Sequence, residues 1–252
     1  EMCIRDRFNR VGYPTVPGFR SIPPAYCYRC FYGKTYPECD LECARALETT
    51  IRAGSNHDVA AFIMEAVQGH GGHIMPPTKE YFKIIREICD KYDVIFIVDE
   101  VQTAPARTGN VFACQTFDFT PDVICVGKGL GGGLPVGAAI FKEDLLPPDF
   151  SKAVWPHAIT NSGQPVLMAA ASAVIDVVLE KRLADQALKM GAYVRELLRP
   201  MEENDPSVIG EIRGPGLFIG VELVQNTNTK ELPTPEQIQM VTQKCLEGGV
   251  IT

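Results

Sequence analysis

The sequence lacks the features that would place it on a nucleic acid or in a membrane. No block is rich in lysine and arginine, and 31 acidic residues outnumber 24 basic ones, which gives a net charge of −7. Nucleic-acid-binding surfaces are basic, so this balance argues against such a partner. The uninterrupted apolar runs have the length of strands and are too short to cross a bilayer. We therefore expect a protein that binds neither nucleic acid nor membrane, with the cytoplasm as its default location.

Internal repeats and low-complexity segments are also lacking, while hydrophobic residues make up 46% of 252, enough for a sizeable core. Short apolar runs at residues 59–64, 94–98 and 123–126 predict strands that are buried on both faces of a sheet. Residues 78–92 carry apolar side chains at helical spacing between the first two runs. A strand, helix, strand unit of this kind predicts an α/β fold with a mostly parallel sheet flanked by helices.

The pattern changes in the second half of the chain. A helix is predicted from Pro165, another over residues 183–198 before Pro200, and a strand over residues 217–224. We therefore expect a large domain over residues 1–200 and the start of a small α+β domain over residues 201–252. Residues 1–7, EMCIRDR, are set aside because they could be non-native.

Two acids and a lysine follow the predicted strands. Glu65 and Asp99 each end an apolar run, and Lys128 lies among glycines just past the third run. Open α/β sheets bind ligands outside the carboxyl ends of their strands, so these side chains can face one ligand. Glycines let a backbone approach a ligand closely, and a partly desolvated amine can attack a carbonyl. Lys128 could equally be a solvated loop lysine, and the two acids could be structural strand-end residues.

The glycines around Lys128 also satisfy the dinucleotide-binding pattern GxGxxG. Here the pattern runs on into Gly133 and Leu134-Pro135, which cannot open the helix that a dinucleotide site requires. No acid ends a strand about twenty residues later to bind a ribose. A nicotinamide cofactor is therefore not expected.

Five segments in this order resemble one family. AAFIMEAVQGHGG, FIVDEVQ, ARTG, PDVICVGKGLGGGLPVGA and HAITNSGQP resemble the class III aminotransferases, which are pyridoxal-phosphate enzymes of fold type I. The resemblance extends from about Tyr13 to the end of the chain. Family members are longer at both ends, so we expect an internal fragment of a homodimeric cytoplasmic enzyme.

The resemblance implies the following roles. Lys128 matches the lysine that holds pyridoxal 5′-phosphate as a Schiff base and moves the substrate proton. Asp99 matches the aspartate that keeps the cofactor ring nitrogen protonated. Gln102 matches the partner of the ring hydroxyl, and Val101 the residue against the ring. Thr160 matches a residue that reaches the phosphate of the neighbouring subunit's cofactor.

Glu65 matches a glutamate that pairs with a substrate-binding arginine and separates amino-acid from oxo-acid substrates. The implied reaction is transfer of an amino group from an amine or amino acid, such as an ω-amino acid like 4-aminobutyrate or an acetylornithine-like donor, to a 2-oxo acid. Racemase, epimerase and aminomutase reactions of the same family remain alternatives, as does a non-catalytic fragment.

Three further features stand outside these roles. Cys27, Cys30, Cys39 and Cys43 could hold a metal, form disulfides or be ordinary thiols, and the resemblance implies no metal. His70, His73 and His157 are not assigned to catalysis. Residues 104–106, Ala-Pro-Ala, replace the Gly-Phe-Gly of most relatives, and the Glu65-Ala66 pair and Gln164 also depart from the usual residues. These departures bear on the substrate-site geometry and hence on the branch of the family.

Overall fold

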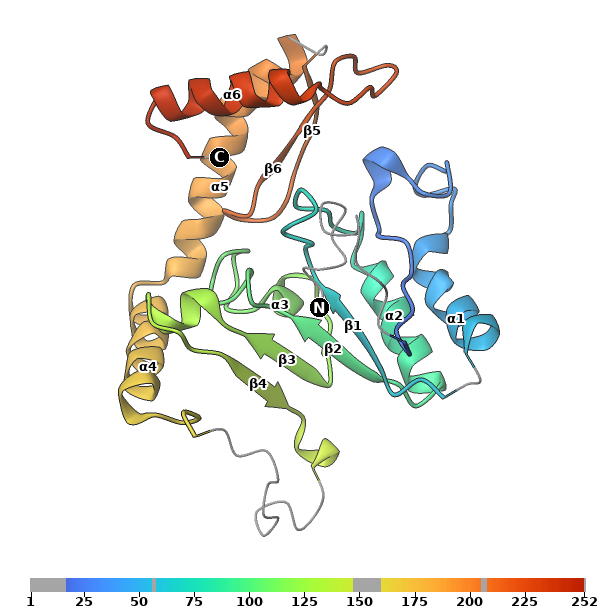
Figure 1. Cartoon of the computed structure of the whole chain (residues 1–252), viewed down its shortest axis with the longest axis vertical. Coiled ribbons are helices and arrows are strands. Elements are labelled where there is room, and N and C mark those ends of the chain that lie inside the picture. The colour runs from blue at the N-terminus through green and yellow to red at the C-terminus, as the bar shows by residue number, and fades with distance from the viewer. Residues whose placement is uncertain (1–16, 56–57, 147–159, 205–207, 252) are drawn as a thin grey trace.

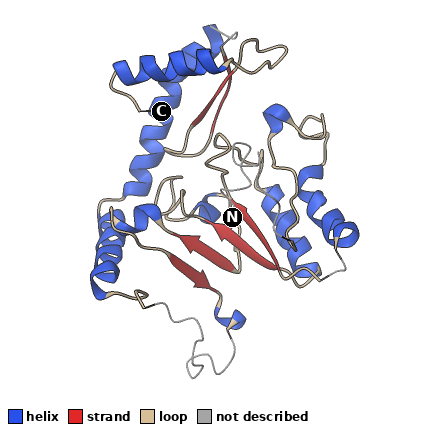
Figure 2. Ribbon diagram, in the orientation of Figure 1, coloured by secondary structure: helices blue, strands red, loops and turns tan. Residues whose placement is uncertain are grey.

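The structure is a computed structural model that describes residues 17–55, 58–146, 160–204 and 208–251. A four-stranded sheet with helices beside it forms the larger part, and a long helix leads from it to a hairpin capped by the last helix (Figures 1 and 2). None of the helices in the described residues has the length and apolarity needed to span a membrane.

The sheet has the strand order β1-β2-β3-β4. Strands β1 (Ala61–Glu65), β2 (Ile95–Asp99) and β3 (Val123–Val126) are parallel, and β4 (Ala138–Phe141) runs antiparallel to β3. The predicted mostly parallel sheet is thus confirmed, although β1 and β2 begin and end slightly later than their apolar runs.

Two helices build the core with this sheet. Helix α2 (Glu80–Lys91) is the predicted crossover between β1 and β2, and α1 (Glu42–Gly54) lies beside it. The helical spacing of its apolar residues puts one face of α2 into the core, where Tyr81, Phe82, Ile84, Ile85 and Ile88 are buried. This packing fixes the strand ends that carry the candidate site residues.

The prediction that the strands are buried on both faces is wrong for the described residues. Phe96 and Val98 are fully buried, but Ile95 of the same strand is 36% exposed and Ile63 of β1 is 41% exposed. Successive side chains of a strand point to opposite faces, and in this part of the chain the buried cluster with α1 and α2 covers one of them.

The remaining elements connect the sheet to the hairpin. They are α3 (Ala113–Thr116), α4 (Pro165–Glu180), α5 (Leu183–Asn204), β5 (Ile209–Arg213), β6 (Gly220–Leu223) and α6 (Pro235–Glu247), with short 3₁₀ turns η2 (Cys27–Arg29), η3 (Lys128–Gly131) and η4 (Glu143–Leu145). Helix α5 was predicted to end before Pro200 but continues to Asn204. A proline inside a helix removes one backbone donor, and the residues around Pro200 keep helical angles. Strand β5, which pairs with β6, was not predicted.

Candidate active site

Three strand ends bring the candidate site residues to one edge of the sheet. The Cα atoms of Glu65 and Asp99 are register partners across β1 and β2, and Asp99 is the partner of Cys125 across β2 and β3. Lys128 follows Cys125 by three residues and opens η3. The predicted convergence at the carboxyl ends of parallel strands is therefore what the sheet register produces.

Asp99 is a half-buried carboxylate with capacity for a further partner. Its Oδ1 accepts a hydrogen bond from the Val101 backbone N–H at 2.8 Å, and the described residues give Oδ2 no donor. A carboxylate offers about four lone-pair sites. Asp99 can thus accept a proton donor that is not part of the described protein, such as a protonated ring nitrogen.

Lys128 is exposed and has a backbone φ of 42°, in the left-handed region. A residue with a Cβ is disfavoured there by roughly 1 to 2 kcal/mol, and such strain gathers at functional sites. Gly127 before it is buried, and a Cβ added to Gly127 would meet the Val101 side chain at 3.4 Å. Val101 therefore packs between the β2 end that carries Asp99 and the β3 end that carries Lys128.

Glu65 and Gln102 meet at Gly69. The Gly69 backbone N–H donates to Glu65 Oε2 at 3.1 Å. A Cβ on Gly69 would collide with the Gln102 side-chain amide, so the glycine is needed for this close approach. Glu65, Asp99, Val101, Gln102 and Lys128 therefore form one continuous edge.

Thr160 stands apart from this edge. It lies with an exposed side chain in the turn before α4, and within the described ranges it makes none of the contacts that link the other five residues. His157 lies outside the described residues. The role expected for Thr160 concerns a neighbouring subunit and stays a prediction.

Glu100, which follows Asp99, was not assigned a role from the sequence. It is fully buried, and its carboxylate accepts the backbone N–H groups of Ala113 and Cys114 at 2.9 and 2.8 Å and the hydroxyl of Thr103. Its own N–H donates to Cys125 O at 2.8 Å. Glu100 thus fixes the segment that carries Val101 and Gln102. Alternation at a strand end turns Asp99 and Glu100 to opposite sides, but the sequence does not tell which of the two faces the interior.

The four clustered cysteines lie away from the strand ends. Cys27, Cys30, Cys39 and Cys43 line one cavity with Tyr26, Tyr32 and Tyr36, and none of them is in a disulfide. Burial, reinforced by the neighbouring Cys27 thiol, raises the pKa of Cys43 to about 11. No group of three or more metal-ligating side chains in the part of the chain described here is arranged to hold a metal.

The two histidines of the QGHGGH segment lie in the loop after β1. His73 packs edge-on against Phe218 with ring centroids 4.3 Å apart. Burial, followed by the charge of Arg213, lowers the pKa of His73, so the neutral ring is favoured in this packing. His70 is exposed.

These features agree with what the comparisons show. The sequence matches the family described as "Aminotransferase class-III" over residues 5–252. The chain therefore belongs to the class III aminotransferases, a family of pyridoxal-phosphate-dependent enzymes.

Among curated proteins, the chain is 40% identical over 234 residues to the leucine/methionine racemase of Thermococcus litoralis, covering 91% of this chain and 51% of the racemase. Among solved structures it is similar to a thermostable (S)-enantioselective omega-transaminase from Thermomicrobium roseum, with a TM-score of 0.87 and 34% identity, covering 97% of this chain and 55% of that one. It also resembles a Bacillus anthracis aminotransferase, with a TM-score of 0.86 and 30% identity over 99% and 55% of the two chains. The chain thus spans about half the length of these relatives.

The described residues fit pyridoxal phosphate. Asp99 has lone pairs to spare, Lys128 presents an exposed amine, Val101 packs against Gly127, and Gln102 lies against Gly69. The second oxygen of Asp99 is the observation on which this fit rests.

Proposed function

We propose that this chain is the cofactor-binding part of a pyridoxal-phosphate-dependent transaminase that moves an amino group from an amine or amino acid to a 2-oxo acid. An ω-amino acid such as 4-aminobutyrate and an acetylornithine-like compound are the donor classes we favour. The observation that carries the proposal is the placement of Asp99 and Lys128 at neighbouring strand ends, joined through Val101 and Gly127.

When bound, the cofactor supplies an electron sink for the carbanion that forms as the substrate loses a proton. Lys128 would hold the cofactor covalently, and its free amine would move a proton at the substrate carbon. Its exposure at the edge of the sheet supports both tasks, since an amine must reach a ligand that lies outside the strands.

The other residues hold the ring. Asp99 would hold the ring nitrogen in its protonated form, since an opposite charge in hydrogen-bond contact keeps both groups ionised. The Val101 N–H, which donates to Asp99 Oδ1, orients that carboxylate. Gln102 would donate to the ring oxygen, and the Val101 side chain would lie against the ring. Glu65 pairs with a substrate-binding arginine and so admits both amino-acid and oxo-acid substrates.

We further infer a homodimer in which Thr160 reaches the phosphate of the partner's cofactor. The resemblance of the segment HAITNSGQP supports this assignment. A cytoplasmic location is supported by the unbridged cysteines of the described residues, since structural disulfides are rare in reducing compartments.

An amino-acid racemase is the second candidate, because the curated relative quoted above carries that name at 40% identity. Racemisation uses the same lysine and aspartate but returns the proton to the opposite face of the substrate carbon. The two reactions differ in whether the amino group leaves the substrate.

Lys128→Ala tests the proposal directly. Pyridoxal phosphate is added to the wild-type chain, to this variant and to a variant of an exposed lysine at the end of α4, Lys181→Ala, and the visible absorbance is recorded after dialysis. The same three proteins are prepared at the full length of the relatives. We expect a dialysis-resistant band in the wild type and in Lys181→Ala that Lys128→Ala lacks.

Incubation with amino donors and a 2-oxo acid then separates the two reactions. A new amino acid formed from the oxo acid supports the transaminase. Loss of optical activity in one amino acid without an oxo acid supports the racemase. The absence of a lysine-dependent band at either length would contradict both.

A further inference from the structure

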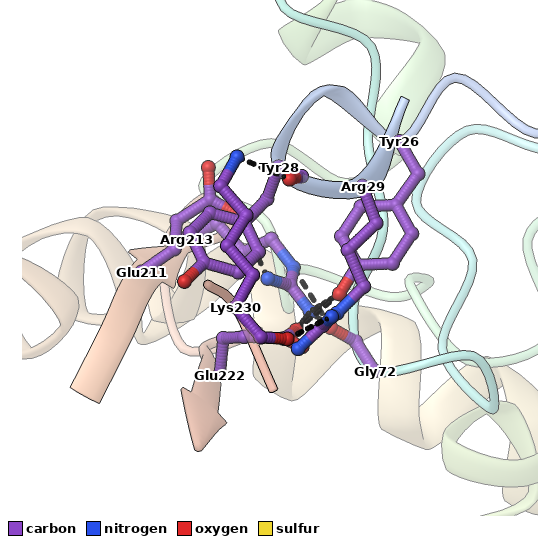
Figure 3. Close-up of polar contacts among 8 residues, drawn as sticks. All are labelled: Tyr26, Tyr28, Arg29, Gly72, Glu211, Arg213, Glu222 and Lys230. Atoms are coloured by element: carbon purple, nitrogen blue, oxygen red, sulfur yellow. Dashed lines mark hydrogen bonds and ion pairs between the residues drawn. The ribbon is translucent and has the colours of Figure 1, made fainter. Parts of the chain in front are cut away.

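A buried polar cluster lies away from the strand ends and joins segments that are far apart in the sequence (Figure 3). Glu222 of β6 is at its centre. Its carboxylate accepts hydrogen bonds from the Tyr26 hydroxyl, from Arg29 Nε at 2.9 Å and from Arg213 Nη2 at 2.8 Å. The cluster therefore fastens the β5–β6 hairpin to the segment around η2.

The cluster is held as charged groups. The side chains of Arg213 and Glu222 are only 9% and 10% exposed. Burial favours the neutral carboxyl, but the hydrogen bonds from Tyr26, Arg29 and Arg213 outweigh it and lower the pKa of Glu222. A buried carboxylate with three donors is firmly placed, because losing a donor would leave charge without a partner.

Arg213 differs from Arg29 in its other partners, one of which is Glu211, to which Arg213 Nη1 donates at 2.7 Å. Both arginines bind Glu222, but Arg213 also donates to the backbone carbonyl of Gly72, from Nε at 3.0 Å and from Nη2 at 2.7 Å. Arg29 instead donates to the carbonyl of Lys230 in the segment after the hairpin. Among these two, Arg213 alone ties the hairpin to the turn after β1.

The hairpin and the turn are also in close contact through their backbones. A Cβ on Gly220 would lie 2.6 Å from Gly72 O, so the two segments touch where Gly220 has no side chain. The His73 ring packs on Phe218, as described above. The Gly72 carbonyl is thus held by the hydrogen bonds from Arg213 and by its close contact with the backbone of Gly220.

This turn leads straight to the candidate active site. Gln68 and Ile74 close it with paired backbone hydrogen bonds of 2.7 and 3.3 Å. Inside it, the Gly69 N–H donates to Glu65, and the Gly69 backbone packs on the Gln102 amide. A shift of Gly72 would therefore move the surface against which Gln102 and Glu65 are set.

We propose that Arg213 is a positioning residue for the cofactor site, acting through the Gly72 carbonyl on the turn that sets Gln102 and Glu65. The step from turn to cofactor rests on the function proposed above. The step from Arg213 to the turn does not, so the two can be tested separately.

Arg213→Met and Arg29→Met form a matched pair. Each removes one cation from Glu222 and leaves a linear apolar side chain, but Arg213→Met alone frees the Gly72 carbonyl. It also unpairs Glu211, and Glu211→Gln measures the effect of losing that pair by itself. Hydrogen exchange of the amides of residues 66–74 reports the turn in the chain without cofactor. Absorbance titration with pyridoxal phosphate reports the cofactor affinity and the pH at which the visible band shifts.

We expect both variants to lower the unfolding midpoint, because both weaken the cluster. Arg213→Met alone should speed exchange at Gly69 by about tenfold, raise the dissociation constant of the cofactor by about tenfold and move the pH midpoint of the band; a tenfold change is about 1.4 kcal/mol. Arg213→Lys, which keeps one donor within the cluster, should recover part of each effect.

The proposal is overturned if exchange in the turn is unchanged in Arg213→Met or changes equally in both methionine variants. It is also overturned if the turn loosens while the cofactor affinity and the pH midpoint stay at their wild-type values. A wild-type protein without a lysine-dependent band would instead contradict the proposed function, and the exchange comparison would still decide whether Arg213 holds the turn.

Discussion

The aspartates at the two edges of the parallel sheet differ in the number of hydrogen-bond donors that the protein gives them. At the amino-terminal edge, Asp122 accepts from Arg86 Nη1, from the Phe96 N–H and from Lys142 Nζ, each at 2.7 Å. At the carboxyl edge, Asp99 has one donor in the described residues, the Val101 N–H. A carboxylate whose acceptor sites are filled by donors of the protein is structural. A carboxylate with unfilled acceptor sites is available to a ligand.

Backbone strain follows the same division. Left-handed φ angles near the amino-terminal edge fall on Asp93 and Asp118, and aspartate tolerates this region. Near the carboxyl edge they fall on His73, which tolerates the region, but also on Ala106, with a φ of 73°, and on Lys128. The carboxyl edge thus keeps residues that local conformational preference disfavours, which is the expected mark of a functional site.

Replacing each aspartate with asparagine should separate the functional role from the structural one. The largest expected effect is on the reaction rate of Asp99→Asn. We expect Asp99→Asn to slow the proposed reaction by on the order of 10³-fold, since it cannot hold the ring nitrogen protonated. Its unfolding free energy should change by under about 1 kcal/mol, because Oδ1 remains.

The matched variant Asp122→Asn should keep the reaction rate and lose about 2 kcal/mol of stability, because charged donors are left unpaired. Initial rates and urea unfolding of both variants provide the measurement. Equal rates in the two variants would contradict the assignment of Asp99 as functional and Asp122 as structural.

The next effect concerns Glu100, the neighbour of Asp99 that is structural although it lies at the functional edge. Glu100→Ala leaves the Ala113 and Cys114 N–H groups and the Thr103 hydroxyl without a partner, so it should lower the unfolding free energy by about 3 kcal/mol. Glu100→Gln keeps an acceptor oxygen and should lose less. Chemical denaturation checks the order, and a stable Glu100→Ala would mean that water replaces these contacts.

Acid should weaken the amino-terminal edge. Burial opposes the charge of Asp122, but the hydrogen bonds from Lys142, the Phe96 N–H and Arg86 lower its pKa below the unfolded value of 3.8. A lowered pKa means that this stabilisation is present above about pH 4 and is lost as the pH falls below it. Unfolding measured between pH 7 and pH 3 should therefore be less pH-dependent in Asp122→Asn; an unchanged slope would assign the loss to other acids.

The smallest effect is expected where strain can be removed. Ala106→Gly should raise the unfolding free energy by about 1 kcal/mol, since glycine adopts the left-handed region without penalty. Asp118→Gly, at a comparable φ of 59°, should gain less because aspartate already tolerates it. Thermal unfolding of the two variants measures both increases. A larger increase in Asp118→Gly would mean that Asp118, and not Ala106, is the more strained residue.

Much of the carboxyl edge could be predicted from the sequence, because an apolar run that ends in an acid marks both the strand and its exit. The periodic apolar residues likewise predicted α2. The exposed face of the sheet could not be predicted, since local composition does not tell which layers cover a strand. The Asp-Glu pair looks symmetric in sequence, and only the fold shows that Glu100 is buried.

The cluster around Glu222 had no sequence signal. Tyr26 and Glu222 are separated by 196 positions, and the segment of β5, IGEIR, has the glycine and charges that weaken a strand prediction. Its contacts depend on how the hairpin docks, which is a property of the tertiary structure. Arg213 could therefore be given a role only once the fold was known.

Cys125 gives the protein an electrostatic probe of its own. It is the register partner of Asp99, and burial followed by the charge of Asp99 raises the pKa of its thiol. A cation placed against Asp99 would offset that charge and make the thiolate easier to form. The rate at which Cys125 is alkylated thus reports whether Asp99 stands alone or faces a positive group, independently of cofactor absorbance.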